Sequence, residues 1–589
     1  MSRLTRRDFI KAAGAGTAAV LLGKAWGATS GRRPNILLVM TDDQGYGDLK
    51  LHGNPQIQTP HLDRFARESV QFERFFVSPV CSPTRASLLT GRYALRCGVW
   101  GVTHGTETMR ESEITIAETL RRAGYRTGMF GKWHNGETYP NTPRGKGFEE
   151  FLGFHNGNCL NYFDAEMLRD TTPTPTKGYI TDVFTDEAIE FMEAHRARPF
   201  FCYVPYNTPH WPPQVPDKYF DRCKKRGLND EESTIYGMCE NIDDNFGRLL
   251  ARLDELKLSD NTIVIFLSDN GPHTVRFNSG MRGIKSSVDE GGGRVPFFIR
   301  WPKGFKGGRL IPQNAAHIDV MPTLLELCGA PPPAGVALDG KSLVPLLEGR
   351  AANWPDRMIF ATRNWDEKKH PGSVRTQQYR AVSDEEGRWK LYDMTADPSQ
   401  ERDIATDHPA LARRLSKAYD AWYADVTRAG FVRFPIPVGY NEENPVYLPA
   451  PQAYFNGGIQ FRGKVGFAHD WLTSWTSTGE EVYWDIDVVT SGEYTLELGY
   501  LCPPEEAGSK IRVSIGDAAA EATVTGTKIQ QLPSRDRLPG TAFVGMVWAA
   551  LPLGKIKLAK GRTKLTVRAI SVPGKMVMDL KHARLKRME

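Results

Sequence analysis

The stretch NILLVMTDDQGYGD, residues 35–48, sets the first expectation because the apolar run ILLVM leads through Thr41 into two carboxylates. A continuous apolar run is typical of a strand buried on both faces, as in a parallel sheet covered by helices. Asp42 and Asp43 then lie at the carboxyl end of this strand, where open α/β sheets place their ligand sites. Adjacent buried carboxylates repel each other, so a cation normally lies between them, whereas an exposed acidic loop needs none.

The same alternation of apolar strands and helices continues to about residue 349. Further strands are expected at FFCYVPY (200–206), TIVIFLSD (262–269) and VPFFIRWP (295–302), and helices at TIAETLRRAG (115–124), DEAIEFMEAHR (186–196) and IDDNFGRLLARLDEL (242–256). This pattern predicts an α/β domain over 34–349, with a mostly parallel central sheet flanked by helices on both faces. A smaller α+β subdomain is expected over 350–427, because MIFATR and YRAVSD precede the helical ALARRLSKAYDAWYADV.

The last part of the chain changes to a two-residue period. Five prolines in FPIPVGYNEENPVYLPAPQ (434–452) indicate a semi-rigid linker, which we place over 428–452. Beyond it, Val482, Trp484, Ile486 and Val488 alternate with polar residues, which predicts an all-β sandwich over 453–589. We expect this sandwich to be a tethered module that small substrates do not need.

The net charge of +6 is concentrated at the N-terminus, where residues 1–27 hold five Lys and Arg against one Asp. The remaining chain has no basic stripe, which argues against a nucleic-acid partner. A basic segment, an apolar run from Ala12 to Gly23 and small residues after it predict a signal peptide over 1–30, and TRRDFIK resembles a bacterial twin-arginine export signal. We therefore expect a periplasmic or extracellular protein that uses the Tat export machinery, with no stable membrane span.

The stretch PVCSPTRASLLTGRY (79–93) places a cysteine at the start of a predicted helix. We expect Ser82 to cap this helix, Pro83 to take its first position and Gly91 to end it. A helix N-terminus attracts anions, so Cys81 lies where an anion would bind, with Arg85 one turn later. None of the eight cysteines forms a CxxC pair, so a zinc cage is not expected, while a disulfide from Cys223 to Cys239 stays open.

Other chemically active residues follow strands elsewhere in the chain. Asp269 and Asn270 end the strand 262–269, and with Asp42 and Asp43 they offer hard oxygen ligands suited to Ca²⁺ or Mg²⁺. The remaining candidates are cationic or basic: Lys132 and His134 two positions apart, His210, and Lys285. A hard cation together with so many positive side chains suits a tetrahedral oxyanion ester as substrate.

These residues lie in segments that resemble the sulfatase family. CSPTRASLLTGR (81–92) matches the family signature C-x-P-x-R with its T-G-R tail, and GYRTGMFGKWH resembles the second signature. DDQG, PHWP, SDNG and GIKSSVDEGGGRVP follow the family in order, as do HIDVMPTLLELCG and LYDMTADPSQERDIA. Over about residues 34–425 the chain resembles a type I, formylglycine-dependent bacterial arylsulfatase or carbohydrate sulfatase, with the alkaline-phosphatase-like fold.

The resemblance implies a specific chemistry at Cys81. A formylglycine-generating enzyme would oxidise Cys81 to Cα-formylglycine, whose hydrate attacks sulfur with one hydroxyl and expels sulfate with the other. By the same resemblance, the Ca²⁺ ligands are Asp42, Asp43, Asp269, Asn270 and the modified Cys81. Arg85 and Lys132 would hold the hydrate, and His134 would take its second proton. His210 and Lys285 would bind the sulfate and protonate the leaving oxygen. One position departs from the family: FLGFHNGNC has Gly157 where a polar residue is common, and we leave that contact, for which Asn158 is a substitute, unassigned.

Three functions remain open from the sequence. The first is a sulfuric ester hydrolase acting on an aryl or, preferentially, a carbohydrate sulfate. The second is a phosphonate monoester or phosphodiester hydrolase with the same signature, and the third is an inactive carbohydrate-binding protein. The filled catalytic positions count against the third, and a sandwich that resembles galactose-binding-like domains favours a polysaccharide substrate. Residues that could line the substrate site are Trp100, His104, Trp365 and Arg375.

Overall fold

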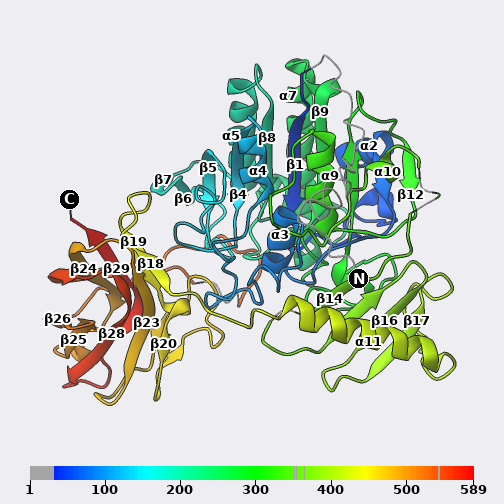
Figure 1. Ribbon diagram of the computed structural model, residues 1–589. Coiled ribbons are helices and arrows are strands. Elements are labelled where there is room, and N and C mark those ends of the chain that lie inside the picture. Colours follow the sequence, from blue (N-terminus) through cyan, green and yellow to red (C-terminus); the bar gives the residue numbers. More distant parts are fainter. Residues whose placement is uncertain (1–31, 351, 353, 364, 541–543, 589) are drawn as a thin grey trace, which may run out of the picture.

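The computed structural model describes residues 32–350, 352, 354–363, 365–540 and 544–588. Figure 1 shows three parts: a large α/β unit, a small sheet carrying a long helix, and a C-terminal sandwich. The signal peptide expected over 1–30 lies outside the described residues. No helix within the described ranges is long and apolar enough to cross a membrane.

The α/β unit is built on a ten-stranded sheet with a parallel centre. Five central strands, β9, β1, β8, β4 and β5, run parallel, and an antiparallel strand joins them on each side, β11 beside β9 and β6 beside β5. In order across the sheet the strands are β12 (Arg309–Ile311), β2 (Val70–Phe72), β11 (Phe297–Arg300), β9 (Thr262–Ser268), β1 (Asn35–Thr41), β8 (Phe200–Pro205), β4 (Arg126–Lys132), β5 (Glu150–Phe154), β6 (Glu166–Arg169) and β7 (Thr172–Pro175). The expected α/β architecture is confirmed, with a sheet that is mixed at its edges.

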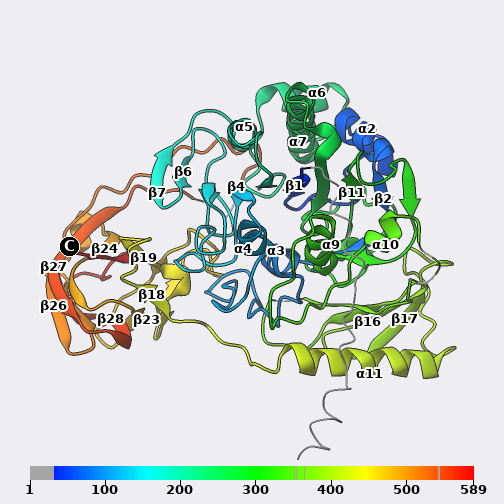
Figure 2. The same cartoon turned by 45° about the horizontal axis from the view of Figure 1, so that its top comes forward.

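Helices cover both faces of this sheet (Figure 2). Leu37 and Val39 of β1 pack into the core on one face, and Ile36 and Leu38 into the core on the other, which explains the continuous apolar run. The first face carries α2 (Pro60–Glu68), α5 (Ile180–Ala194), α6 (Asp217–Lys225) and α7 (Asp230–Glu255). The second carries α3 (Cys81–Thr90), α4 (Ile116–Arg122), α9 (Val320–Leu327) and α10 (Val344–Leu347).

Short elements connect these layers. A three-stranded sheet combines β10 (Arg294–Val295), β3 (Phe75–Phe76) and β13 (Ala315–Ala316), and α8 (Glu290–Gly293) precedes β10. The 3₁₀ turns are η1 (Lys50–His52), η2 (Ser259–Asn261), η3 (His317–Asp319), η5 (Ala450–Gln452) and η6 (Pro504–Glu506). Helix α7 begins well before the expected residue 242, because Asn229 and Glu232 form a capping box that starts it at Asp230.

The small unit consists of one antiparallel sheet and one helix. The strands are β14 (Ile359–Thr362), β15 (Gly372–Arg375), β16 (Tyr379–Ser383) and β17 (Trp389–Asp393), in that order. Helix α11 (Pro409–Val426) lies across them, with Leu415 and Tyr419 packed against Val374 and Leu391.

The sandwich places two sheets face to face around one apolar core. One sheet contains β18 (Ile436–Val438), β23 (Glu481–Val488), β28 (Gly561–Ser571), β25 (Lys510–Ile515) and β26 (Ala518–Thr523), with β20 (Tyr454–Phe455) beside β23. The other contains β21 (Gln460–Phe461), β22 (Leu472–Thr473), β29 (Asp579–Arg587), β24 (Gly492–Leu501) and β27 (Ala549–Leu558), with β19 (Val446–Pro449) beside β29. The alternating Val482, Trp484, Ile486 and Val488 are fully buried, as their period predicts.

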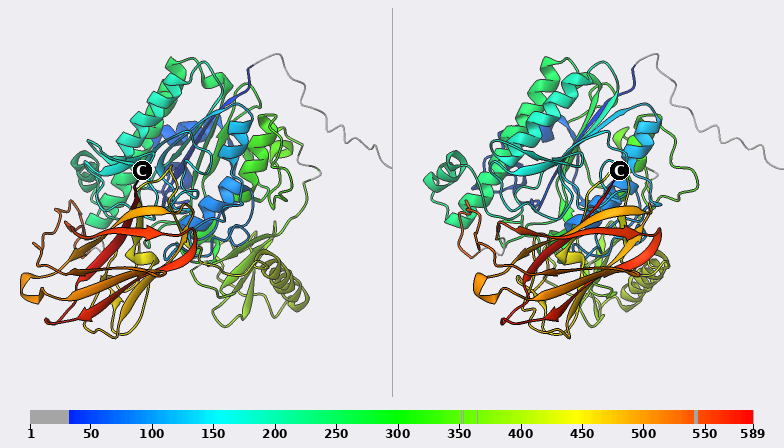
Figure 3. Two further views of the ribbon diagram at one scale, coloured as in Figure 1. Left: turned by 60° about the vertical axis from the view of Figure 1, so that its left-hand side comes forward. Right: turned by 90° about the vertical axis from the view of Figure 1, so that its left-hand side faces the viewer.

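The segment expected to be a linker over 428–452 instead contributes to the sandwich. Strands β18 and β19 lie within it, and Ile436, Val438 and Leu448 are buried in the sandwich core. A proline is tolerated in β18 because this strand lies at the edge of its sheet. The sandwich also lies against the α/β unit (Figure 3), and Thr103 donates a hydrogen bond to the Gly466 carbonyl at 2.6 Å. The expectation of a separately tethered module is therefore wrong.

Candidate active site

The predicted metal ligands directly follow the carboxyl ends of two neighbouring strands of the large sheet. Strands β1 and β9 are parallel neighbours in which Thr41 is opposite Ser268, so the residues that follow each strand emerge side by side. Asp42, Asp43, Asp269 and Asn270 are all at most 1% exposed. The Asp43 amide donates to Asp269 Oδ1 at 3.2 Å, which joins the two strand ends directly.

Helix α3 presents Cys81 at its first position. Residue Val80 is the N-cap and provides no side-chain cap, so the expected capping by Ser82 is wrong. The Ser82 hydroxyl instead donates to the Glu107 carbonyl at 3.4 Å, while Gly91 ends the helix in the left-handed conformation as expected. Cys81 is 3% exposed, and its sulfur lies within 4.8 Å of a carboxylate oxygen from each of Asp42 and Asp269.

Three cations pair with the three carboxylates. Lys132 Nζ lies 2.6 Å from Asp42 Oδ2, and Lys285 Nζ lies 2.6 Å from Asp43 Oδ1. Arg85 Nη2 donates to Asp269 Oδ2 at 2.7 Å, and its Nη1 donates to the Lys132 carbonyl at 2.9 Å. These six charged side chains therefore balance one another, and each carboxylate pairs with a cation through one of its oxygens.

Several other oxygens of this cluster have no hydrogen-bond partner. They are Asp42 Oδ1, Asp43 Oδ2 and Asn270 Oδ1, all buried. An unsatisfied buried acceptor costs about 1–3 kcal/mol, so a cation between these oxygens would stabilise the site. Two overlapping groups have the spacing of metal ligands: Asp42 with Asp43 and His210, and Asp42 with Cys81 and Asp269. The oxygen-rich donor set fits a hard divalent cation such as Ca²⁺ or Mg²⁺.

The pKa values of the carboxylates diverge. Burial, followed by the charge of Asp42, raises the pKa of Asp269 to about 7. Burial is the largest influence on the pKa of Asp42 and of Asp43 and acts to raise it, but the surrounding positive charges, led by Lys132 at Asp42 and by Lys285 at Asp43, together outweigh burial and hold both pKa values below their usual range. A divalent cation at this site would also favour the ionised form of Asp269.

His134 is placed to accept a proton. It follows β4 with a positive φ of 62°, and its Nε2–H donates to the Val102 carbonyl at 2.9 Å. Because a carbonyl can only accept, the lone pair of the neutral ring is on Nδ1, which is buried without a partner. Burial, followed by the charge of Lys132, lowers the pKa of His134 well below its ordinary value, so the ring is neutral near pH 7.

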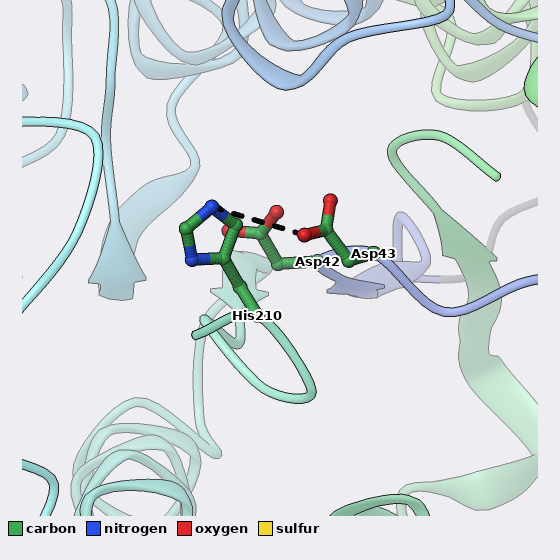
Figure 4. A group of neighbouring side chains, drawn as sticks. All are labelled: Asp42, Asp43 and His210. Atoms are coloured by element: carbon green, nitrogen blue, oxygen red, sulfur yellow. Dashed lines mark ion pairs between the residues drawn. The ribbon is translucent and has the colours of Figure 1, made fainter. Parts of the chain in front are cut away.

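Two further histidines lie close to the Asp43 carboxylate. His210 Nε2 lies 3.8 Å from Asp43 Oδ2 (Figure 4), and its Nδ1–H donates to the Trp211 carbonyl at 2.7 Å. Burial, with Lys285 next, lowers the pKa of His210 to about 4. His273 Nδ1 also lies 3.8 Å from Asp43 Oδ2. His273 was not among the site residues predicted from the sequence, although it follows the same strand end as Asp269.

A cavity of about 430 Å³ opens above Cys81, within the usual size range of ligand pockets. Its lining includes Cys81, Val102, His134, Gly157, Asn158, His210, Trp211, His273, Lys285, Ser286, Trp365, Phe467 and Ala468. Of the expected substrate-site residues, Trp365 lines the cavity. The others lie elsewhere: Trp100 packs on Phe431, the His104 ring nitrogens face the Pro451 and Val465 carbonyls, and Arg375 pairs with the buried Glu290.

Gly157 has a steric reason to lack a side chain. A Cβ atom at this position would lie 2.8 Å from His134 Nε2, closer than van der Waals contact allows. The polar residue that is common at this point would therefore displace His134. The neighbouring Asn158 lines the cavity, and its buried Oδ1 has no hydrogen-bond partner.

All eight cysteines are buried free thiols, so Cys223 and Cys239 are not joined. Both lie in the core between α6 and α7.

Comparison with known proteins identifies the family. Residues 34–330 match the family described as Sulfatase, and residues 285–419 match N-sulphoglucosamine sulphohydrolase, C-terminal. Residues 3–23 match the twin-arginine translocation pathway signal sequence, so the protein is exported to the periplasm or the extracellular space. Both catalytic-domain matches end before the first strand of the sandwich at Ile436.

Individual relatives agree with this assignment. A solved phosphonate monoester hydrolase from Silicibacter pomeroyi has a TM-score of 0.50 at 21% identity, which shows a shared fold alone. The structure of Ps i-CgsB in complex with k-i-k-neocarrahexaose has a TM-score of 0.64 at 28% identity, over 68% of this chain and 95% of that chain. Human N-acetylgalactosamine-6-sulfatase is 35% identical over 56% of this chain and 68% of its own length, and human arylsulfatase A is 32% identical over 68% and 84%. With the family match over half of the chain and arylsulfatase A matched over most of its length, this chain belongs to the sulfatase family of sulfuric ester hydrolases.

Proposed function

We propose that this protein removes sulfate from a carbohydrate sulfate ester, using Ca²⁺ and a Cα-formylglycine derived from Cys81. One observation carries the proposal: Cys81, at the first position of α3, lies within 4.8 Å of ligand oxygens from Asp42 and Asp269, at the base of a cavity lined by cationic and imidazole side chains. Maturation would need a formylglycine-generating enzyme, and the Tat machinery would export the folded product.

The metal site is supported by the donor set. The proposed ligands are Asp42, Asp43, Asp269, Asn270 and the modified Cys81, and the unpartnered buried oxygens of Asp42, Asp43 and Asn270 fit a hard cation. When bound, Ca²⁺ would supply positive charge for the oxygens of the sulfate group, and Mg²⁺ remains an alternative ion. Because Arg85, Lys132 and Lys285 already balance the three carboxylates, a divalent ion would make the site electropositive and attract an anionic ester.

The protein side chains around Cys81 divide the remaining tasks. The hydrate of formylglycine would supply the attacking hydroxyl and the second hydroxyl that releases sulfate. Arg85 and Lys132 would orient this group, and the free Nδ1 of neutral His134 would take its second proton. His210 and Lys285 would bind the sulfate and protonate the leaving oxygen, since Lys285 is cationic and an approaching sulfate would raise the pKa of His210.

The proposed substrate class is supported by the names of two relatives and by the aromatic residues that line the cavity. One relative is named N-acetylgalactosamine-6-sulfatase, and Ps i-CgsB was solved with a neocarrahexaose. Trp211 and Trp365 line the cavity beside the proposed sulfate-binding residues, and aromatic rings commonly contact the apolar faces of sugars. We further propose that residues 34–427 carry the catalytic site and that the sandwich is an accessory domain.

Mass spectrometry and two substrate series test this proposal. Protein made with a formylglycine-generating enzyme should lose the thiol at Cys81 and release sulfate from a panel of monosaccharide sulfates. The same preparation should hydrolyse an aryl phosphonate monoester far more slowly; the reverse order would favour the phosphonate hydrolase. Active protein whose Cys81 is entirely unmodified would contradict the formylglycine assignment, and sugar binding without any hydrolysis would favour an inactive binding protein.

A further inference from the structure

One wall of the cavity above Cys81 comes from the sandwich. Residues 462–471, here called the sandwich loop, connect β21 and β22 and reach the α/β unit. Phe467 and Ala468 of this loop line the cavity together with His134, His210 and Lys285. The two sandwich residues are therefore about 180 positions or more along the chain from the three α/β residues with which they share the cavity.

The sandwich loop is fastened to the two segments that flank His134. Thr103 follows Val102, the residue whose carbonyl accepts from His134, and donates to the Gly466 carbonyl at 2.6 Å. Asn158 follows Gly157, which lies under the His134 ring, and its carbonyl accepts from His469 Nε2 at 2.9 Å. The loop thus holds both segments at once.

Hydrogen bonds within the sandwich give the loop a defined shape. The Asp470 carboxylate accepts from the Gly463 amide at 3.1 Å, and the Asp470 amide donates to the Phe467 carbonyl at 2.9 Å. Lys581 of β29 donates to the carbonyl of Asp470 at 3.2 Å and to that of His469. Phe467 is therefore presented by a loop that is bonded on both sides.

Phe467 meets Trp365 at the cavity wall. The two rings lie 5.9 Å apart at an angle of 68°, an edge-to-face contact. Trp365 Nε1 donates to Ser286 Oγ at 3.0 Å, next to Lys285. The cavity therefore has a charged floor around Cys81 and an aromatic wall to which the sandwich contributes one of the rings.

We propose that Phe467 of the sandwich loop, with Trp365, forms the subsite for the ring of the leaving group, so that the sandwich determines specificity even for small esters. The inference rests on the proposed sulfatase function, and it concerns the organic part of the substrate rather than the sulfate. A six-membered ring offers a flat apolar face for Phe467 and Trp365, while its ester oxygen is directed toward His210 and Lys285. The shared chemistry is that ring face, carried by either a sugar or an aryl sulfate.

Substitution of Phe467 tests this subsite. F467A should lower kcat/KM about tenfold for 4-nitrophenyl sulfate or a monosaccharide 6-sulfate, mainly through KM, because an aromatic contact and its buried area are lost. Inorganic sulfate, which has no ring, should inhibit F467A and the unsubstituted protein with the same Ki. F467L, which keeps an apolar side chain, should lose less. V465A is the matched control, because Val465 lies on the same loop and is 47% exposed.

The outcomes separate the subsite from the proposed function. A larger loss on the sugar ester identifies a sugar subsite, and a larger loss on the aryl ester identifies an aryl subsite. Unchanged kcat/KM in F467A and F467L would overturn the proposal, as would an equal weakening of ester and inorganic sulfate, because the effect would then arise at the sulfate-binding residues. If the unsubstituted, modified protein hydrolyses no sulfate ester, the proposed function fails and this inference fails with it.

Discussion

At the level of single residues, the site buries several ionisable side chains, each of which would destabilise the fold without its charged neighbours. Burial raises the pKa of the Cys81 thiol despite nearby Lys132 and Lys285, so the unmodified thiol would stay protonated and be a poor nucleophile. This agrees with a role for Cys81 after modification rather than as a thiol. The same burial makes each carboxylate depend on a cation, since an uncompensated buried charge is strongly destabilising.

We expect D269N to lose the stabilisation by calcium. Ca²⁺ at a hundredfold excess over its Kd should stabilise the unsubstituted protein by about 2.7 kcal/mol and raise its Tm. Asn keeps the volume of Asp269 and an acceptor for the Asp43 amide but lacks the negative charge, so the Tm of D269N should no longer respond to calcium. Thermal unfolding with Ca²⁺ and with a chelator measures this.

D244N is the matched control, because Asp244 belongs to a second acidic group, with His61 and Asp243, that shares no residue with the groups around Asp42 and Cys81. Its Tm should rise with calcium as in the unsubstituted protein. If calcium still raised the Tm of D269N but not that of D244N, the metal site would have to be assigned to the second acidic group instead.

We expect G157A to lose activity while remaining folded. The added Cβ would lie 2.8 Å from His134 Nε2 and 2.9 Å from Cε1, so the ring must move away from the carbonyl that orients it. A displacement of this size at a proton acceptor should lower kcat about a hundredfold. The measurement is kcat for a sulfate ester, with circular dichroism to verify folding.

G479A is the control for an added methyl group. Gly479 is exposed, and the nearest atom to an added Cβ there is Ser477 Oγ at 3.5 Å. Full activity in G157A would mean that the position of His134 is not essential.

At the level of secondary-structure elements, the small four-stranded sheet is attached to the α/β unit by a buried ion-pair cluster. Glu290 of α8 is 1% exposed and accepts from Arg375 of β15 at 3.3 Å and from Arg380 of β16 at 2.9 Å. Burial acts to raise the pKa of Glu290, but the neighbouring arginines, led by Arg375 and Arg380, together outweigh burial and keep the carboxylate ionised. A single carboxylate therefore balances two buried guanidinium groups between two layers.

We expect E290Q to be strongly destabilised. Loss of the charge leaves Arg375 and Arg380 buried without a counter-ion, which should cost about 3 kcal/mol or more. Urea unfolding would measure the change in the free energy of unfolding. E386Q is the control, because Glu386 pairs with Arg388 at the surface, where an ion pair contributes about 0–1 kcal/mol. Equal stability of the two variants would rule out the proposed structural role of Glu290.

At the level of the whole molecule, the sandwich and the α/β unit meet through partly buried ionisable groups. The Glu443 carboxylate accepts from the Tyr139 amide, and Gln452 Nε2 donates to Glu137 at 3.3 Å. Burial raises the pKa of Glu137 and of Glu443 to about 7 and lowers that of Lys581 to about 8. Contact between the two units should therefore depend on pH.

We expect E443Q to be more stable than the unsubstituted protein above pH 7 but not near pH 4.5. The pKa of Glu443 is raised to about 7 in the folded state, so the folded protein binds this proton more tightly than the unfolded chain. The stability that it contributes is therefore present at low pH and is lost as pH rises through about 7. Gln keeps an acceptor for the Tyr139 amide and does not ionise.

The Tm difference between E443Q and the unsubstituted protein, measured across pH 4.5–8, tests this. The exposed neighbour Glu442 supplies the control variant E442Q, whose Tm difference should not change with pH. A flat difference for E443Q would show that Glu443 is ionised equally in the folded and unfolded states.

The strand-like runs at 35–48 and 262–269, with the helical patterns between them, were sufficient to predict the α/β class and the strand ends that carry Asp42 and Asp269, and residues 79–93 were sufficient to predict the helix that begins near Cys81. Local pattern sufficed because both faces of the parallel strands are covered, which leaves an uninterrupted apolar run followed by polar side chains. The alternation in 482–488 similarly predicted the sandwich, because one face of each strand packs on the core.

The contribution of the sandwich to the cavity could not be read from local pattern. Phe467 lies far along the chain from Cys81 and in a segment without strand periodicity, and its position depends on hydrogen bonds from Thr103 and Lys581. The proline-rich segment was predicted wrongly for the same reason, since edge-strand pairing by β18 depends on a partner strand fifty residues further along the chain. Sequence periodicity reports which face of an element is buried, whereas contact between separate units depends on surfaces that are complementary only after each has folded.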